Sequence, residues 1–202
     1  MQKLIYVGQF TYTFHYTETI YIKCVVQENE PKDLYYDSWA TIFFTDNEKT
    51  KRLAFSIVYE KLYDFSYFLK KSLHKENIVD EQHIQDIGFL FNEMHYRKSM
   101  LHEKIMLNEL YDHVMWSPVV AEENIQTWLY NNTNGEIILF LAPVYPFFFT
   151  KPCKKNPSYQ EWIKAYKPFG RYIIAQDIAQ QWLKQAHDIM NLIETNSASK
   201  ST

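Results

Sequence analysis

Apolar and polar residues alternate along the first quarter of the chain, and this alternation predicts β-strands. The stretches "LIYVGQFTYTFHY", "ETIYIKCVV" and "SWATIFF" are rich in β-branched and aromatic residues, which favour strands. Successive residues of a strand point to opposite faces. This divides the second stretch into two sets: Tyr21, Lys23 and Val25, and Ile22, Cys24 and Val26. We therefore expect one face of this sheet to be drier than the other.

The hydrophobic pattern changes to a helical period after residue 50. Within "KRLAFSIVYEKLYDFSYFLKKSL", the apolar residues at helical spacing are Phe55, Val58, Leu62, Phe65, Leu69 and Leu73. A helix is predicted from about Tyr59 onward, whereas residues 52–58 fit either this helix or a hairpin with "TIFF". A second helix is predicted from Asp80, which can cap it, to Met115, with one break near residues 96–99.

The second half of the chain predicts a hairpin, a short helix, a strand and a long helix. Asn134-Gly135 is a hairpin signal, so we predict paired strands over Ile125–Tyr130 and Glu136–Leu141. The stretch "SYQEWIKAY" then favours a short helix and "GRYII" a strand. A final helix is predicted from Asp177. Its apolar stripe at helical spacing consists of Ile178, Trp182, Ala186, Ile189 and Ile193.

This order of elements predicts an α+β fold. Strands come first, helices follow, and a hairpin and a helix end the chain, which is typical of a mainly antiparallel sheet with helices packed on it. The sheet is expected to combine the N-terminal strands with the later β-hairpin. A length of 202 residues favours one domain. We predict a single α+β domain over residues 1–196 and a disordered polar tail, "SASKST", over residues 197–202.

Composition and charge narrow the classes of partner and the compartment. Hydrophobic residues make up 47% of the chain, enough for a real core. The net charge is -3 and the arginines number only three, so the basic stripe of a nucleic-acid reader is missing and no nucleic-acid partner is expected. The longest apolar run, residues 137–149, is shorter than the roughly 20 residues of a membrane span, so no membrane partner is expected. Two cysteines make no disulfide framework, and the N-terminus lacks a signal-peptide pattern, so we expect a cytoplasmic protein.

The sequence offers few candidates for chemistry. The four glycines form no phosphate-binding motif, and no cofactor is expected. His95, His102, Glu109 and His113 would share one face of an unbroken helix. However, residues seven apart lie about 10.5 Å apart along the axis. One ion cannot span that gap, so only Glu109 and His113 could share a metal. We predict no metal site and no catalytic residue, and the sequence leaves open whether these four residues form a functional face.

Cys153 is the one candidate nucleophile that the sequence suggests. It lies between Pro152 and Lys154, and a nearby lysine can lower the pKa of a thiol. The alternative is a packed or idle thiol, because free cysteines behave mostly as small hydrophobic residues.

The stretch "APVYPFFFTKPC", residues 142–153, is rich in both aromatic rings and prolines. Prolines cannot donate to a sheet ladder, so the preceding strand is expected to end near Leu141. Neighbouring rings of an extended chain cannot all face one way. They either close one end of the core or provide a rigid aromatic anchor for a protein partner. We predict that the partner-binding residues are Tyr145, Phe147, Phe148 and Trp162.

The C-terminal half resembles a known class of binding proteins. The stretches "TWLYNNTNGEIILFLAPVYPFFF", "EWIKAYKPFGRYII" and "IAQQWLKQAHDIMNLIE" resemble small bacterial immunity-type proteins of polymorphic toxin systems, over Gln126–Glu194. This resemblance rests on architecture and transfers no binding residue. It implies a non-catalytic bacterial protein that neutralises a cognate toxin by direct occlusion. The alternative is a small-molecule or metal-dependent enzyme, for which Glu109, His113 and Cys153 are the residues to test.

Overall fold

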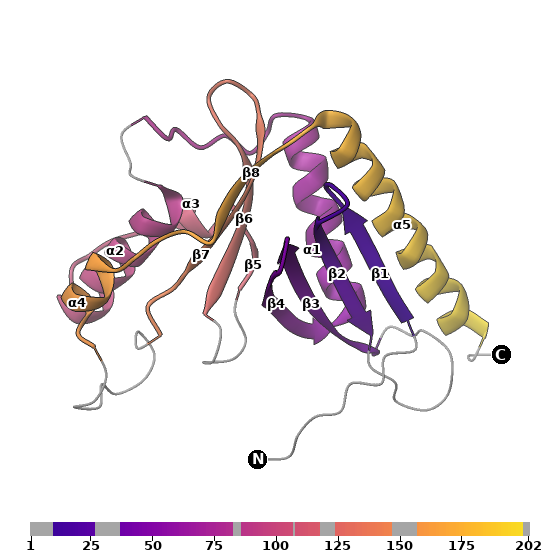
Figure 1. The fold of residues 1–202 in the computed structure, drawn as a ribbon, viewed down its shortest axis with the longest axis horizontal. Coiled ribbons are helices and arrows are strands. Elements are labelled where there is room, and N and C mark those ends of the chain that lie inside the picture. Colours follow the sequence, from indigo (N-terminus) through magenta and orange to yellow (C-terminus); the bar gives the residue numbers. More distant parts are fainter. Residues whose placement is uncertain are drawn as a thin grey trace, which may run out of the picture.

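The computed structural model describes residues 10–26, 37–82, 86–106, 108–117, 124–146 and 157–199, and it confirms the α+β class (Figure 1). Sheet A is an antiparallel meander of β1 (Phe10–His15), β2 (Ile20–Val26), β3 (Trp39–Asp46) and β4 (Lys49–Ile57). Sheet B is a second antiparallel meander, made of β5 (Val114–Trp116), β6 (Ile125–Asn131), β7 (Ile137–Pro143) and β8 (Gly170–Ile174). The later hairpin therefore belongs to a sheet of its own and, contrary to the expectation from the sequence, does not join the N-terminal strands in one sheet. The helices are α1 (Val58–Leu73), α2 (Ile87–Met100), α3 (Asn108–Tyr111), α4 (Tyr159–Lys164) and α5 (Gln176–Ser199).

Sheet A confirms the predicted alternation of dry and wet positions. Ile22, Cys24 and Val26 of β2 are buried, whereas the residues between them are half-buried. Residues 52–57, which the sequence left open, belong to β4, and α1 starts at the next residue. Pairing with β3 through a bulge next to Phe43 holds this segment in the sheet.

The main core lies between the two sheets and the two long helices. The ring of Phe65 on α1 lies 5.3 Å from the ring of Trp116 and 5.8 Å from that of Trp182 on α5, measured between centroids. These large rings bury much apolar area, so they join α1, α5 and sheet B into one hydrophobic core.

Helix α5 also covers the free edge of sheet A. Trp182 Nε1 donates to the backbone oxygen of His15 at 2.9 Å, and Gln185 Nε2 donates to that of Thr13 at 3.1 Å. An uncovered edge strand is a template for pairing with other chains. These two side chains occupy acceptors on β1 that such pairing would use.

Sheet B is buried on both faces. Every residue of β6 is buried, as is every residue of β7 before Pro143. One face belongs to the main core and the other packs against α2 and α4, with Phe91, Trp128 and Phe140 at its centre. In Figure 1, sheet B accordingly lies between sheet A on one side and α2 with α4 on the other.

Gly88 allows α2 to lie close to sheet B. A Cβ atom at this position would lie 2.7 Å from the Cβ of Ala142 and 2.5 Å from the hydroxyl of Tyr166. Real Cβ atoms do not approach other atoms so closely, so the absence of a side chain brings the helix onto β7.

The prediction of one long helix over Asp80–Met115 is wrong. Helix α2 begins only at Ile87, and its cap is Asp86, whose Oδ1 accepts a bond from the backbone N–H of Phe89 at 2.6 Å. Asp80 instead accepts from the backbone N–H of Gln82, which is a turn contact. The chain leaves the helix after Met100 and not at residues 96–99, and the left-handed conformation of His102 (φ 56) is incompatible with a continuing helix. Residues 114–116 then pair with β6 as a strand.

The predicted elements of the second half are confirmed, with small shifts at several of their ends. The hairpin of β6 and β7, the short helix α4, the strand β8 and the helix α5 are all present. Strand β7 runs to Pro143 and not to Leu141, because Pro143 can close the ladder opposite Ile125 without donating. Helix α5 extends to Ser199, where the serine hydroxyl donates to the backbone oxygen of Asn196. Residues 197–199 of the expected disordered tail are therefore helical, and residues 200–202 lie outside the described residues. None of the described helices is long and apolar enough to cross a membrane.

Candidate functional site

Helix α4 presents one of the predicted binding residues, Trp162, and a capping box fixes where this helix starts. Ser158 Oγ accepts from the backbone N–H of Glu161 at 3.3 Å, and Glu161 Oε2 accepts from the backbone N–H of Ser158 at 2.8 Å. Both bonds satisfy amides that a helix start leaves unpaired. The hydrogen bonds from Ser158 also lower the pKa of Glu161. A helix of this length is marginal by itself, so the box and the packing beneath it define the position of Trp162.

Three tyrosine rings hold Trp162. Its ring centroid lies 5.5 Å from that of Tyr145, 6.1 Å from that of Tyr159 and 5.8 Å from that of Tyr166. These separations fall within the range of favourable aromatic pairs. Trp162 is half-buried, and its indole N–H makes no hydrogen bond to a described residue. The side chain is thus fixed in position and still reaches the surface.

The supporting tyrosines are buried and hydrogen-bonded. The hydroxyl of Tyr159 donates to Glu93 Oε2 at 3.1 Å, and that of Tyr166 donates to Asp86 Oδ1 at 2.8 Å. Burial, together with the adjacent carboxylates, raises the pKa of both phenols. They therefore remain protonated donors at neutral pH, and the ring cluster keeps one hydrogen-bonding pattern.

Asn92 connects α2 to the end of β7 beneath this cluster. Its Nδ2 donates to the backbone oxygens of Gly88 at 2.7 Å and Pro143 at 3.0 Å, and its Oδ1 accepts from the backbone N–H of Tyr145 at 2.7 Å. A buried amide is costly unless its groups are paired, and here both ends are used. This contact fixes the backbone from which Tyr145 projects.

The predicted binding residues thus differ in their accessibility. Tyr145 is only 5% exposed, and its hydroxyl donates to the backbone oxygen of Pro157 at 2.9 Å. It supports Trp162 from below and offers a partner little surface of its own. Phe147 and Phe148 lie outside the described residues. The supporting Tyr159 and Tyr166 were not predicted from the sequence, although the Ser158-x-x-Glu161 pattern of a capping box lies beside them.

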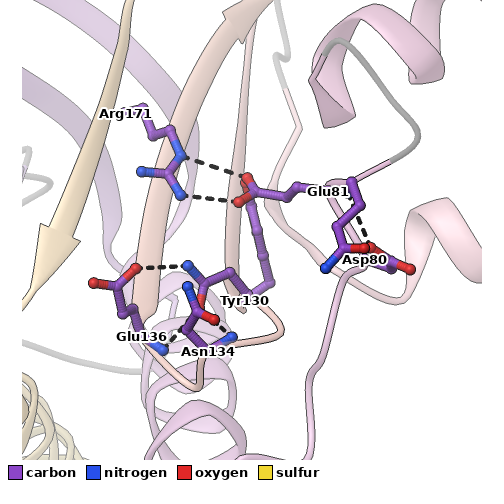
Figure 2. A network of polar contacts seen from close by, with 8 residues as sticks. Asp80, Glu81, Tyr130, Asn134, Glu136 and Arg171 are labelled. Carbon is purple, nitrogen blue, oxygen red and sulfur yellow. Dashed lines mark hydrogen bonds and ion pairs between the residues drawn. The ribbon is translucent and has the colours of Figure 1, made fainter.

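A polar network on sheet B connects the segment before α2 to this sheet (Figure 2). Arg171 Nη2 donates to Glu81 Oε2 at 2.9 Å, and the hydroxyl of Tyr130 donates to Glu81 Oε1 at 2.5 Å. Burial, reinforced by Glu81, raises the pKa of Tyr130. The carboxylate is satisfied from two strands, so the network ties the segment before α2 to sheet B.

Two of the four residues of the candidate histidine face, the buried His95 and the half-buried His113, have structural roles. His95 Nε2 lies 2.7 Å from the hydroxyl of Tyr111, and burial, with a contribution from Lys98, lowers the pKa of His95 to about 4. His113 Nδ1 lies 2.5 Å from Asn77 Oδ1, and burial lowers its pKa as well. Both rings are neutral at pH 7. The chain leaves the helix between them, so they do not share a helix face.

The remaining candidates for chemistry do not gather into a site. His102 is exposed on the connection after α2, and the side chain of Glu109 and the whole of Cys153 lie outside the described residues. Among the described residues, no three potential metal ligands come together. Cys24 is buried in sheet A, and burial raises the pKa of its thiol to about 12, so it is not a nucleophile at neutral pH.

A polar hollow of about 370 Å³ lies where α1 meets β5. Its charged side chains, Lys61 and Asp64, pair with each other at 2.9 Å. Tyr111 also lines this hollow, and its hydroxyl is already bonded to His95. Tyr111 also has a raised pKa, caused by burial. A tyrosine that holds its proton more tightly beside a histidine that resists protonation is a poor acid–base pair.

Comparison with known protein families, curated proteins and solved structures found no match to this chain. The resemblance to immunity-type proteins therefore gains no support from a relative. The arrangement of the side chains is therefore the basis for inferring a function. Trp162, supported by three tyrosine rings, is the surface feature that best fits a binding site.

Proposed function

We propose that this protein is a non-catalytic binding module that recognises a protein partner through the surface around Trp162. The observation that carries this proposal is a half-buried tryptophan that is held by three tyrosine rings and whose indole N–H makes no hydrogen bond to a described residue. Tryptophans dominate the binding energy of many interfaces. A ring already fixed in position loses little conformational entropy when a partner binds.

The surroundings of Trp162 suit an interface. Tyr96 of α2 stacks on Tyr159 with a centroid distance of 4.1 Å and an angle of 9° between the rings, and Tyr96 is itself half-buried. The aromatic surface therefore extends from α4 onto α2. Exposed polar residues surround it, namely Gln160, Glu161, Lys164 and Lys167. An apolar centre with a polar rim is the usual anatomy of a protein interface.

We further propose that the partner is a toxin and that binding occludes it in the bacterial cytoplasm. The resemblance of the C-terminal half to immunity-type proteins supports this assignment. A rigid, preorganised surface also suits tight, long-lived inhibition, because most differences in affinity arise in the dissociation rate.

A pull-down from the native cell lysate, read by mass spectrometry, tests the proposal. We expect one stoichiometric protein partner with the wild-type chain and its loss with Trp162→Ala. Calorimetry with the purified partner is expected to show a loss of about 2 kcal/mol or more, roughly 30-fold in Kd. The partner expressed alone should arrest growth, and co-expression of the wild-type chain should restore it.

Trp39→Ala is the matched control. Trp39 is a surface tryptophan of sheet A, 40% exposed and packed on Phe55, and its removal is expected to leave affinity unchanged. Equal losses in the two variants would contradict the assignment of the surface. Lys164→Glu provides a second test that does not disturb the ring cluster, because Lys164 is exposed on α4. Unchanged affinity in both α4 variants would reject the proposal.

A further inference from the structure

A small hollow on the opposite side of sheet B from α4 has features of a ligand site. It has a volume of about 180 Å³, and its walls come from the end of α1, the β6–β7 hairpin, β8 and the start of α5. These segments meet at one end of the molecule (Figure 1). The volume equals that of roughly six water molecules, which suits a small organic molecule.

One wall of the hollow is positive. Lys75 lines it in a left-handed conformation (φ 57), and its side chain lies against Gly135, where Nζ would be 3.2 Å from an added Cβ. The Lys75 ammonium forms no ion pair with any described residue. A lysine without a carboxylate partner beside a hollow is suited to bind an anionic group.

The start of α5 adds to this positive wall. Ala179 N–H donates to the backbone oxygen of Ala175, so Ala175 occupies the cap position, where it has no side-chain oxygen to offer. Asp177 accepts from the backbone N–H of Ile178, which leaves earlier amides of this first turn for a ligand. Gln176, the first residue of the helix, lines the hollow. The amides at a helix start attract carboxylates.

Glu136 of the hairpin supplies a negative group to the same hollow. Its Oε2 accepts from Asn132 Nδ2 at 2.6 Å, a contact that orients the carboxylate in Figure 2. Glu136 and Lys75 form no ion pair with each other, although both line this hollow. Two opposite charges that stay apart at one hollow are suited to a ligand that carries both charges.

The floor of the hollow is apolar apart from one unsatisfied hydroxyl. Ile137 and Ile174 are buried there, so the floor suits an aliphatic group. Ser72 is 1% exposed and lines the hollow, and its Oγ has no hydrogen-bond partner among the described residues. A buried hydroxyl without a partner is costly, and a polar atom of a ligand would satisfy it.

We propose that this hollow binds a small aliphatic amino acid. The ligand carboxylate pairs with Lys75 and the first amides of α5, its ammonium pairs with Glu136, and its side chain lies on the floor formed by Ile137 and Ile174. An aliphatic amino acid of about eight non-hydrogen atoms matches the volume. This site lies apart from Trp162 and does not depend on the proposed protein partner.

Calorimetric titration of the full chain with L-valine tests the proposal. We expect saturable binding, at least about tenfold tighter than that of two analogues, since each lacks one charge-assisted contact. These analogues are 3-methylbutanoate, which lacks the ammonium, and 2-methylpropylamine, which lacks the carboxylate. Equal binding of 3-methylbutanoate or of inorganic phosphate would overturn the proposal in favour of a simple anion site. Absence of any binding of valine at millimolar concentration would also overturn it.

Variants locate the binding site. Lys75→Met and Glu136→Gln are each expected to weaken valine binding by about tenfold or more. The matched controls, Lys70→Met on α1 and Glu48→Gln in the turn after β3, change exposed residues outside the hollow and should bind valine as the wild type does. Circular dichroism confirms that each variant is folded. Wild-type affinity in both hollow variants would reject the site.

Discussion

Sheet A and sheet B have the same strand order and each is followed by a long helix, yet they differ in burial. In sheet A, β2 alternates between buried and half-buried residues, as expected for an antiparallel sheet with one face on the core. In sheet B, β6 and β7 are buried on both faces. The difference comes from α2 and α4, which cover only sheet B.

This difference shows where the candidate interface gets its rigidity. The second face of sheet B packs against α2 and α4 in a separate hydrophobic cluster, and Trp162 lies on the outer side of this cover. Among the described residues, no comparable layer covers the outer face of sheet A. The outer surface of sheet A therefore consists of the side chains of the sheet itself, whereas the surface around Trp162 is supported by a second hydrophobic cluster.

Phenylalanine truncation on the two sheets is expected to give the largest contrast. Phe140 of β7 is 1% exposed within the second core, and Phe140→Ala should lower the free energy of unfolding by about 3–5 kcal/mol. Phe43 of β3 is half-buried on the outer face of sheet A, and Phe43→Ala should cost about 1 kcal/mol. Urea unfolding followed by circular dichroism measures both values. Similar costs would show that the two sheets are buried alike.

Most strands of the two sheets were predictable, because their own residues carry the pattern of a strand, but β5 was missed and much of β4 was left open. The alternation in "ETIYIKCVV" and the apolar runs around Asn134-Gly135 were enough to predict β2, β6 and β7. The helix over Asp80–Met115 was wrong because its end depends on distant pairing. Residues 114–116 become a strand only because β6 lies beside them. The residues near them in the sequence carry no pattern that indicates this pairing.

The candidate site was predictable only in part for a related reason. Aromatic richness indicated Trp162 and Tyr145, but a sequence does not say which ring lies outermost. The burial of Tyr145 follows from the contact of its backbone with Asn92, which lies far from it along the chain. The sequence left open whether His95, His102, Glu109 and His113 form a functional face. His95 and His113 do not share a helix face, because the chain leaves the helix between them.

Removal of Asn92 is the next test of the difference between the sheets. Asn92→Ala removes the two hydrogen bonds that link α2 to the end of β7, to Pro143 and Tyr145, and one bond within α2 to Gly88, and it leaves backbone groups unpaired. We expect a loss of roughly 2–3 kcal/mol in the free energy of unfolding. The fluorescence of Trp162, isolated by comparison with Trp162→Phe, should report a looser environment. A stable variant with unchanged fluorescence would show that α2 does not fix the aromatic cluster.

The pH dependence of stability tests the same layer of helices on sheet B, because His95 is buried in α2. We expect a smaller effect from it. The pKa of His95 falls from an ordinary value near 6.5 to about 4 in the folded chain. Between these two values the unfolded chain binds the extra proton and the folded chain does not, so stability falls as the pH decreases from about 6.5 to about 4. His113 is also lowered and adds a change of the same sign. No change from these two groups is expected above pH 7.

By about pH 5 we expect His95 to contribute roughly 2 kcal/mol to this loss. Unfolding by urea at a series of pH values measures it, and His95→Gln should flatten the curve between pH 4 and 6.5 because glutamine does not titrate. A matched change at an exposed histidine, His102→Gln, should leave the curve unchanged. If His95→Gln retains the full dependence, the ring is accessible to water in the folded chain. The end of α2 would then be open, and the cover that distinguishes sheet B from sheet A would stop short of His95.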